Sequence, residues 1–252
     1  MNIKKNIIGF YGCPSESVIQ SVRDKYPDHE WVDLDVDYSN PDSGILHGAY
    51  CRIIRNIIDN SISLKNTLEL VIASVGADKC DGGRYAAFLL RQLGFNIMEV
   101  SNDEVKTCEN PELIEVPISS SGLPLVDKID RIMNGILHRD EDEYARVEPT
   151  HGFWGVPPND FDLLRLFPDS THVYGWTRTV EANRPADIDL ECYVDDGVPT
   201  VFFFQSFCAK SQLAMYLAKK HTGLYIDIDG KIGMGTKAKI EAFLELSKRQ
   251  DE

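Results

Sequence analysis

The sequence predicts an α/β fold built from two similar Rossmann-like lobes, each a doubly wound parallel sheet, with a cleft between them. Three observations lead to this prediction. Short apolar runs alternate with segments of helical periodicity, residues 68–74 form a short run that is apolar apart from Glu69 and Ser74, and the motifs of the first half return in the second. A continuous apolar run is typical of a strand buried on both faces, as in a parallel sheet. We expect a first lobe over residues 1–118, a linker with a bridging helix over 119–150, and a second lobe over 151–252.

The elements of the first half follow from its periodicity. Residues 6–10 form a short apolar strand, and residues 31–36 alternate between apolar and polar side chains, as in a half-buried strand. Apolar residues at helical spacing predict a helix at 49–59. Another apolar-periodic helix follows Cys80, and Gly94 supplies the residue that ends it.

The second half repeats the order of the first. The segment Gly9-Phe-Tyr-Gly-Cys-Pro is echoed by Gly152-Phe-Trp-Gly-Val-Pro. The succession of strand, cysteine, helix, glycine and strand around Cys80 returns around Cys208. Several echoes in the same order indicate a duplication, and a duplication predicts two lobes of one topology. A helix around residues 126–137 is the expected bridge between them.

Composition excludes several classes of function. The chain of 252 residues carries a formal net charge of −14, so it would repel the phosphates of a nucleic acid rather than neutralise them. No stretch approaches the roughly 18–20 apolar residues of a membrane span. The apolar run near the first residue is broken by Gly9 and Gly12, which favours a buried strand over a signal peptide. We therefore expect a cytoplasmic protein that binds neither nucleic acid nor membrane.

Six cysteines in a cytoplasmic chain are not expected to form disulfides. Cys80 and Cys208 each follow a buried strand and precede a helix, which is where open α/β sheets collect ligands. A helix N-terminus also favours the thiolate, the form that ligates metals and attacks electrophiles. Cys51 precedes an apolar helix and Cys13 lies in the turn after the first strand, so both are expected at the same edge of the first lobe.

Three kinds of site fit such thiols. Two facing thiols could be the acid and the base of a cofactor-independent racemase. Three or four thiolates could hold zinc, although no C-x-x-C knuckle or nearby histidine pattern accompanies them. Thiolates from separate lobes could instead hold an iron–sulfur cluster, a site that tolerates widely separated ligands. Spacing alone leaves the racemase and the cluster open.

Other residues are weaker candidates. Cys13, His151 and Trp176 are candidates for lining the pocket or for an additional ligand, although a histidine in such a place is more often a hydrogen-bonded structural residue. Cys108 lies in a polar stretch and Cys192 in an acidic one, so both are expected to be incidental.

Three cysteine motifs share one resemblance. They are Val75-Gly-Ala-Asp-Lys-Cys80-Asp-Gly-Gly-Arg, Gln205-Ser-Phe-Cys208 and Tyr50-Cys51-Arg-Ile-Ile-Arg. Together they resemble the cysteine loops of the 2-hydroxyacyl-CoA dehydratase D-component family, which includes benzoyl-CoA reductase subunits and double-cubane cluster proteins. The segment that begins at Gly9 is similar to that family's opening strand, and the segment that begins at Gly235 is similar to its closing helix. The motifs run in order along nearly the whole chain, which is shorter than typical members.

The resemblance implies an iron–sulfur cluster, either [4Fe-4S] or a double-cubane [8Fe-9S], held between the lobes by Cys51, Cys80 and Cys208. It also implies a homodimer, or a heterodimer with a related subunit, and an ATP-hydrolysing iron–sulfur activator that injects one low-potential electron. The implied reaction is reduction or radical dehydration of a small substrate such as an acyl-CoA thioester. The chain departs from the family at Lys237, where arginine is usual, and at Cys13, an additional thiol. The alternatives are a cluster-free two-thiol enzyme and a non-catalytic cluster-binding or maturation protein.

Overall fold

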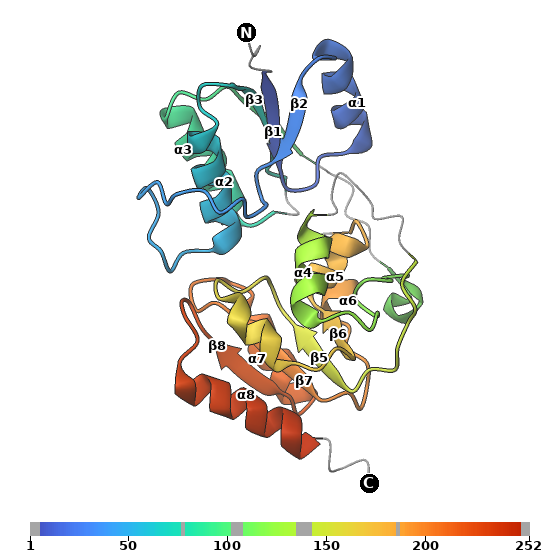
Figure 1. Ribbon diagram of the computed structural model, residues 1–252. Coiled ribbons are helices and arrows are strands. Elements are labelled where there is room, and N and C mark those ends of the chain that lie inside the picture. The colour runs from blue at the N-terminus through green and yellow to red at the C-terminus, as the bar shows by residue number, and fades with distance from the viewer. Residues whose placement is uncertain (1–5, 77–78, 102–107, 135–142, 185–186, 248–252) are drawn as a thin grey trace. The chain divides into compact units, whose positions relative to one another are not determined.

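The computed structural model describes residues 6–76, 79–101, 108–134, 143–184 and 187–247 (Figure 1). The chain divides into two compact units, Met1–Val105 and Lys106–Glu252. Within the described residues, each unit contains a four-stranded sheet whose neighbouring strands all run parallel. The prediction of an α/β protein with two Rossmann-like lobes is therefore confirmed.

The first unit has the strand order β2-β1-β3-β4. Its strands are β1 (Ile7–Tyr11), β2 (Glu30–Asp33), β3 (Leu68–Ser74) and β4 (Ile97–Val100). Its helices are α1 (Glu16–Lys25), α2 (Arg52–Ser63) and α3 (Asp81–Gln92). Figure 1 shows α2 and α3 on one side of this sheet and α1 on the other, so the sheet is covered on both faces.

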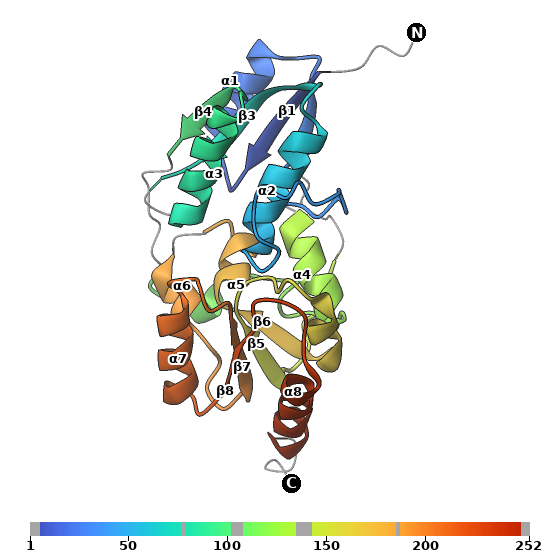
Figure 2. The ribbon, with the colours of Figure 1, turned by 90° about the vertical axis from the view of Figure 1, so that its left-hand side faces the viewer.

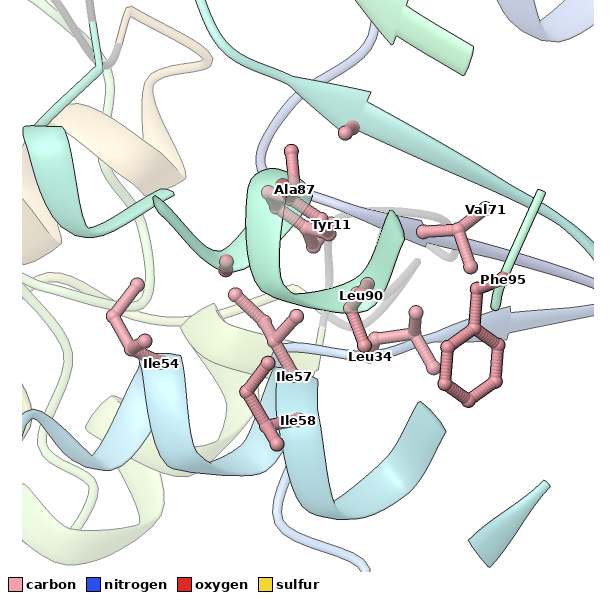
Figure 3. Close-up of a cluster of buried hydrophobic side chains, with 11 residues drawn as sticks. Tyr11, Leu34, Ile54, Ile57, Ile58, Val71, Ala87, Leu90 and Phe95 are labelled. Atoms are coloured by element: carbon pink, nitrogen blue, oxygen red, sulfur yellow. The ribbon is translucent and has the colours of Figure 1, made fainter. Parts of the chain in front are cut away.

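The core of the first unit lies where α2 and α3 pack on the sheet (Figure 3). Helix α2 contributes Ile54, Ile57 and Ile58, which are spaced along one helical face. Helix α3 meets them through Ala86 and Ala87, whose small side chains let its backbone approach closely. Burial of each isoleucine side chain contributes roughly 1.5–3 kcal/mol. This packing holds the two helices beside each other on the sheet.

The second unit has the corresponding strand order, β6-β5-β7-β8. Its strands are β5 (His151–Trp154), β6 (Thr171–Tyr174), β7 (Thr200–Phe204) and β8 (Leu224–Asp227). Its α-helices are α4 (Leu125–Asn134), α5 (Trp176–Glu181), α6 (Ile188–Cys192), α7 (Ser211–Lys220) and α8 (Met234–Ser247). Two 3-10 helices complete it, η1 (Pro111–Leu113) and η2 (Phe161–Leu166).

The two units differ most in the connection after their first strand. In the first unit this connection is α1, whereas the second unit has only the 3-10 helix η2. The side chain of Asp160 caps η2 by accepting a hydrogen bond from the backbone N–H of Asp162, at 3.1 Å.

The helix expected as a bridge is α4, and residues 135–142 beyond it lie outside the described residues. Helix α4 is counted with the second unit, where it packs against α5, β6 and η2. Its buried face holds the apolar residues Leu125, Ile129, Ile132 and Met133. The division between the units thus falls at residue 105, and residues 119–150, expected as a linker, belong to the second unit.

Helix α4 also buries a lysine. Lys128 has no exposed surface, and its Nζ donates hydrogen bonds to the backbone oxygens of Asp169 at 2.9 Å and Thr171 at 2.6 Å. Burial disfavours the charged ammonium and lowers the pKa of Lys128 to about 8, although Asp169 and Glu181 act in the opposite direction. The lysine therefore ties α4 to β6 at an electrostatic cost that depends on pH.

We expect the free energy of unfolding to rise as pH increases above about 8, because the folded state loses the Lys128 proton there while the unfolded state keeps it. Below that pH both states are protonated and the cost of burying the charge is fully present. From pH 8 to 9.5 the wild type should gain roughly 1–2 kcal/mol relative to Lys128→Met, as measured by urea unfolding at each pH. Parallel pH curves for the two proteins would contradict this account.

Candidate functional site

Both sheets bring cysteines to the carboxyl ends of their middle strands. In each sheet the connections diverge between two neighbouring strands, β1 and β3 in one unit and β5 and β7 in the other. This divergence is the topological switch point, the place where open α/β sheets bind ligands. Cys13 follows β1, Cys80 follows the loop after β3, and Cys208 follows β7. The expected placement of these three cysteines at strand ends agrees with the structure.

Cys51 and Cys80 lie at the starts of two adjoining helices of the first unit. Cys51 is the N-cap residue of α2 and is half-buried, whereas Cys80 is the N-cap residue of α3 and is exposed. A Cβ atom on Gly82 would lie 3.4 Å from the sulfur of Cys80 and 3.2 Å from Cγ1 of Ile54 in the first turn of α2. The sulfur of Cys80 and the first turn of α2 therefore meet over Gly82, where a larger residue would separate them.

Cys208 lies in a fixed turn of the second unit, three residues before α7. Its backbone N–H donates to the oxygen of Gln205 at 3.0 Å, and its own oxygen accepts from the N–H of Ser211 at 3.1 Å. Asp229 holds the same turn, because its carboxylate accepts from the backbone N–H of Ser206 at 2.7 Å and from the Ser206 hydroxyl. The half-buried thiol thus stands on a loop with defined backbone partners.

Cys13 is buried in the turn after β1. The turn depends on Gly12, whose φ of +71° lies in the left-handed region that favours glycine. A Cβ atom there would lie 2.8 Å from the Cβ of Ser74 and 3.4 Å from Cε of Lys79. Gly12 therefore lets the end of β3 and the side chain of Lys79 approach the β1 turn.

Two aspartates beside this turn were missed by the sequence analysis. The carboxylate of Asp35 accepts a hydrogen bond from the backbone N–H of Gly12 at 2.8 Å, and Asp33 accepts one from the N–H of Asp35 at 2.9 Å. Each aspartate is only 6% exposed. The alternation of residues 31–36 predicted a half-buried strand, but β2 spans only Glu30–Asp33, so Asp35 lies beyond its end. The signal available in the sequence was the pair of acidic residues at the carboxyl end of a strand.

The environment of the two aspartates favours protonation. Burial raises the pKa of Asp33 well above its usual range, and the neighbouring Asp35 raises it further. Burial also raises the pKa of Asp35 to about 6, although the hydrogen bond from Gly12 and the charge of Lys79 act in the opposite direction. Two carboxyl groups this close cannot both ionise easily, so we expect the pair to hold a proton near neutral pH.

The remaining pocket candidates occupy different places. His151 is the first residue of β5, at the opposite end of the sheet from the Cys208 loop. Its ring nitrogens lie 3.1 Å from Oγ1 of Thr150 and 3.1 Å from the backbone oxygen of Leu244. The structure therefore places His151 away from the cysteine-bearing edge, as a histidine joined to α8. Trp176 is half-buried at the start of α5, directly after β6, and so lies at the carboxyl edge.

A second polar group lines a cavity of about 490 Å³ in the second unit. Asp195 accepts a hydrogen bond from the hydroxyl of Tyr174 at 2.8 Å and another from the hydroxyl of Tyr193. The guanidinium of Arg178 lies 4.7 Å from the centre of the Tyr193 ring. Burial alone would raise the pKa of Asp195, but the two hydroxyls, Arg178 and His172 hold it below its usual value. The described lining contains no cysteine, so this cavity is separate from the thiol-bearing loops.

The described residues were also searched for metal-binding groups and for membrane-spanning helices, and the sequence was compared with known proteins. Among the described residues, no group of three or more His, Cys, Asp or Glu side chains is arranged to hold a metal ion. Across the same part of the chain, no helix combines the length and the apolar character needed to cross a bilayer. A scan of protein-family models finds no match to the chain, and a search of curated proteins finds none either.

We expect Gly12→Ala to destabilise the first unit more than Gly44→Ala. The two glycines have nearly equal φ, +71° and +70°, but only a Cβ on Gly12 would collide with other atoms. Left-handed backbone strain costs roughly 1–2 kcal/mol in either variant. The collision with Ser74 should add about 1–3 kcal/mol in Gly12→Ala alone. Chemical unfolding of both variants measures the difference, and equal losses would show that the β1 turn is not tightly packed.

Proposed function

We propose that the chain binds an iron–sulfur cluster through Cys51, Cys80 and Cys208 and works in low-potential, one-electron chemistry on a small molecule. One observation carries the proposal. Cys80 and Cys208 come after the corresponding strands, β3 and β7, of two sheets with the same strand order. A shared ligand explains a thiol at both switch points of two corresponding sheets more simply than two unrelated cysteines do.

The donor set suits such a group. None of the six cysteines forms a disulfide, and none of the three proposed ligands is fully buried. Cys51 and Cys80 stand at helix N-termini, where the helix dipole favours negative charge such as a thiolate. Thiolates are the usual ligands of iron–sulfur clusters. When bound, a cluster supplies the low-potential electron, while the chain's own loops fix the positions of the sulfurs.

The surrounding residues have supporting roles in this proposal. Asp229 holds the Cys208 turn through Ser206, and Gly82 leaves space for the sulfur of Cys80. The buried Cys13 would line the site next to them rather than complete the ligand set. In keeping with the family resemblance, the proposed partners are a second subunit and an ATP-hydrolysing activator that delivers the electron, in the cytoplasm.

We expect anaerobically reconstituted wild type to be brown, with about four or more irons per chain and matching sulfide. Each of Cys80→Ser, Cys208→Ser and Cys51→Ser should lose most of its iron, since a neutral hydroxyl replaces a thiolate. Cys192→Ser is the matched control, because Cys192 is half-buried at the end of α6 and is not a proposed ligand. It should keep the full iron content.

The same preparations separate the alternatives. Full iron in both Cys80→Ser and Cys208→Ser would falsify the cluster proposal. A colourless wild type that interconverts enantiomers, and loses this activity in the two serine variants, would identify a two-thiol racemase. A brown protein that reacts with no acyl-CoA thioester would point to a cluster-binding or maturation role.

A further inference from the structure

We propose that Asp35 and Asp33 take up a proton when the site at the Cys80 edge gains an electron, so that reduction is coupled to protonation of this carboxyl pair. The inference rests on the proposed function and assigns roles to two residues outside its ligand set. They are positioning residues, because they act through charge rather than by contact with a substrate.

The first support is the arrangement at the switch point. The β1–β2 register extended by two residues pairs Gly12 with Asp35, and the β1–β3 register extended by one residue pairs Gly12 with Ser74. Asp35, Gly12 and Ser74 therefore lie side by side in one row. Gly12 stands in the middle without a side chain, and its N–H donates to Asp35. Cε of Lys79, the residue before Cys80, lies over Gly12. The row therefore connects the carboxyl pair to the loop that carries the thiol.

The second support is the lack of partners for buried polar atoms in this row. Oδ2 of Asp33, Oδ1 of Asp35 and Oγ of Ser74 are inaccessible, and none has a hydrogen-bond partner among the described residues. The Ser74 side chain is 3% exposed, and its Oγ faces the open position over Gly12. Folding gains nothing from burying such groups, since each costs free energy unless it is paired. Groups of this kind cluster at functional sites.

The third support comes from the second unit, which serves as an internal control. Gly12 corresponds to Gly155 by the repeated motif, and Gly155 is also left without space for a side chain. The strand registers then match Asp33 to Val173, Asp35 to Gly175 and Ser74 to Phe203. The same fold is thus built without any polar atom in the row's side chains. The carboxyl pair is not a requirement of the topology.

The charges around Asp35 favour this coupling. The positive charge of Lys79 offsets part of the pair's negative charge. Burial and the charge of Asp35 in turn raise the pKa of the Tyr11 hydroxyl, and burial and the charge of Asp33 raise the pKa of the Tyr38 hydroxyl. The raised pKa values leave the pair with one proton near neutral pH and room for a second. An electron added at the Cys80 edge makes the negative charge of the Asp35 carboxylate more costly. Asp35 therefore takes up a proton from solvent.

The step balances in charge and atoms. A low-potential reductant, dithionite in the test, gives one electron to the cluster-bearing site. Asp35 accepts one proton from solvent and becomes a neutral carboxylic acid, while Asp33 keeps its own proton. The net charge of the edge is unchanged, and no bond other than O–H forms.

The test is a potentiometric titration of the reconstituted protein from pH 6 to pH 8, with the reduced fraction followed by electron paramagnetic resonance. In wild type the reduction equilibrium constant should fall about tenfold per pH unit above pH 6, which is 59 mV for a one-electron couple. In Asp35→Asn the potential should be independent of pH, because the amide accepts no proton. Asp33→Asn is the second variant, and it should keep the slope, because the amide replaces a carboxyl group that stays neutral while Asp35 still accepts the proton.

Asp160→Asn is the matched control. It makes the same isosteric change in a carboxylate that accepts hydrogen bonds from the backbone N–H groups of Asp162 and Ile232, and Asp160 has no part in the proposed site. It should keep the wild-type slope. A flat wild-type profile, or a full slope in Asp35→Asn, would overturn the inference while leaving the iron content, and hence the proposed function, intact. A wild type that binds no iron would overturn both.

Discussion

Burial of the middle strands on both faces is the constraint on which the rest of this structure depends. Strands β1 and β3, like β5 and β7, lie between helices and neighbouring strands, so their side chains are almost entirely apolar. Polar chemistry can then be placed only where these strands end. The loops after them carry Cys13, Cys80 and Cys208, together with the glycines that let these loops pass close to the sheet.

The same constraint explains which parts of the fold the sequence could predict. The strand at Leu68–Ser74 was predicted with its observed bounds, because a strand buried on both faces leaves a continuous apolar signature. The repeat of the Gly9 motif at Gly152 predicted two sheets of one topology for a related reason, since a close-packed turn keeps its glycines. Both features could be predicted from the local sequence because local packing determines which residues can stand there.

The candidate site was predictable only in part. The positions of Cys80 and Cys208 relative to their strands follow from chain order, and the structure agrees with them. Asp33 and Asp35 were missed because an alternating pattern looks the same whether its polar residues face water or the edge of a sheet. His151 was considered for the pocket because it was expected near the second-lobe cleft, but it is the first residue of β5 and so lies at the amino end of that strand. The direction of the strand, and not the residue type, determines at which edge of the sheet a side chain lies.

A comparison of the two units also explains why the sites are unequal. Each switch point carries a thiol after its third strand, Cys80 in the first unit and Cys208 in the second. The first unit has two more thiols, Cys13 after β1 and Cys51 at the start of α2, whereas the second unit has Gly175 and Trp176 at the start of α5. The first unit also adds the buried carboxyl pair, whose burial costs several kcal/mol that its core has to offset. In the second unit Val173, Gly175 and Phe203 occupy the matching places without that cost. The proposed ligands Cys51, Cys80 and Cys208 supply three thiolates, one fewer than the four irons of a [4Fe-4S] cluster. A cluster bound by these three residues would therefore leave one iron open to an outside ligand. The two sheets thus provide equivalent frames, and the first unit carries most of the polar groups through which the proposed chemistry would be controlled.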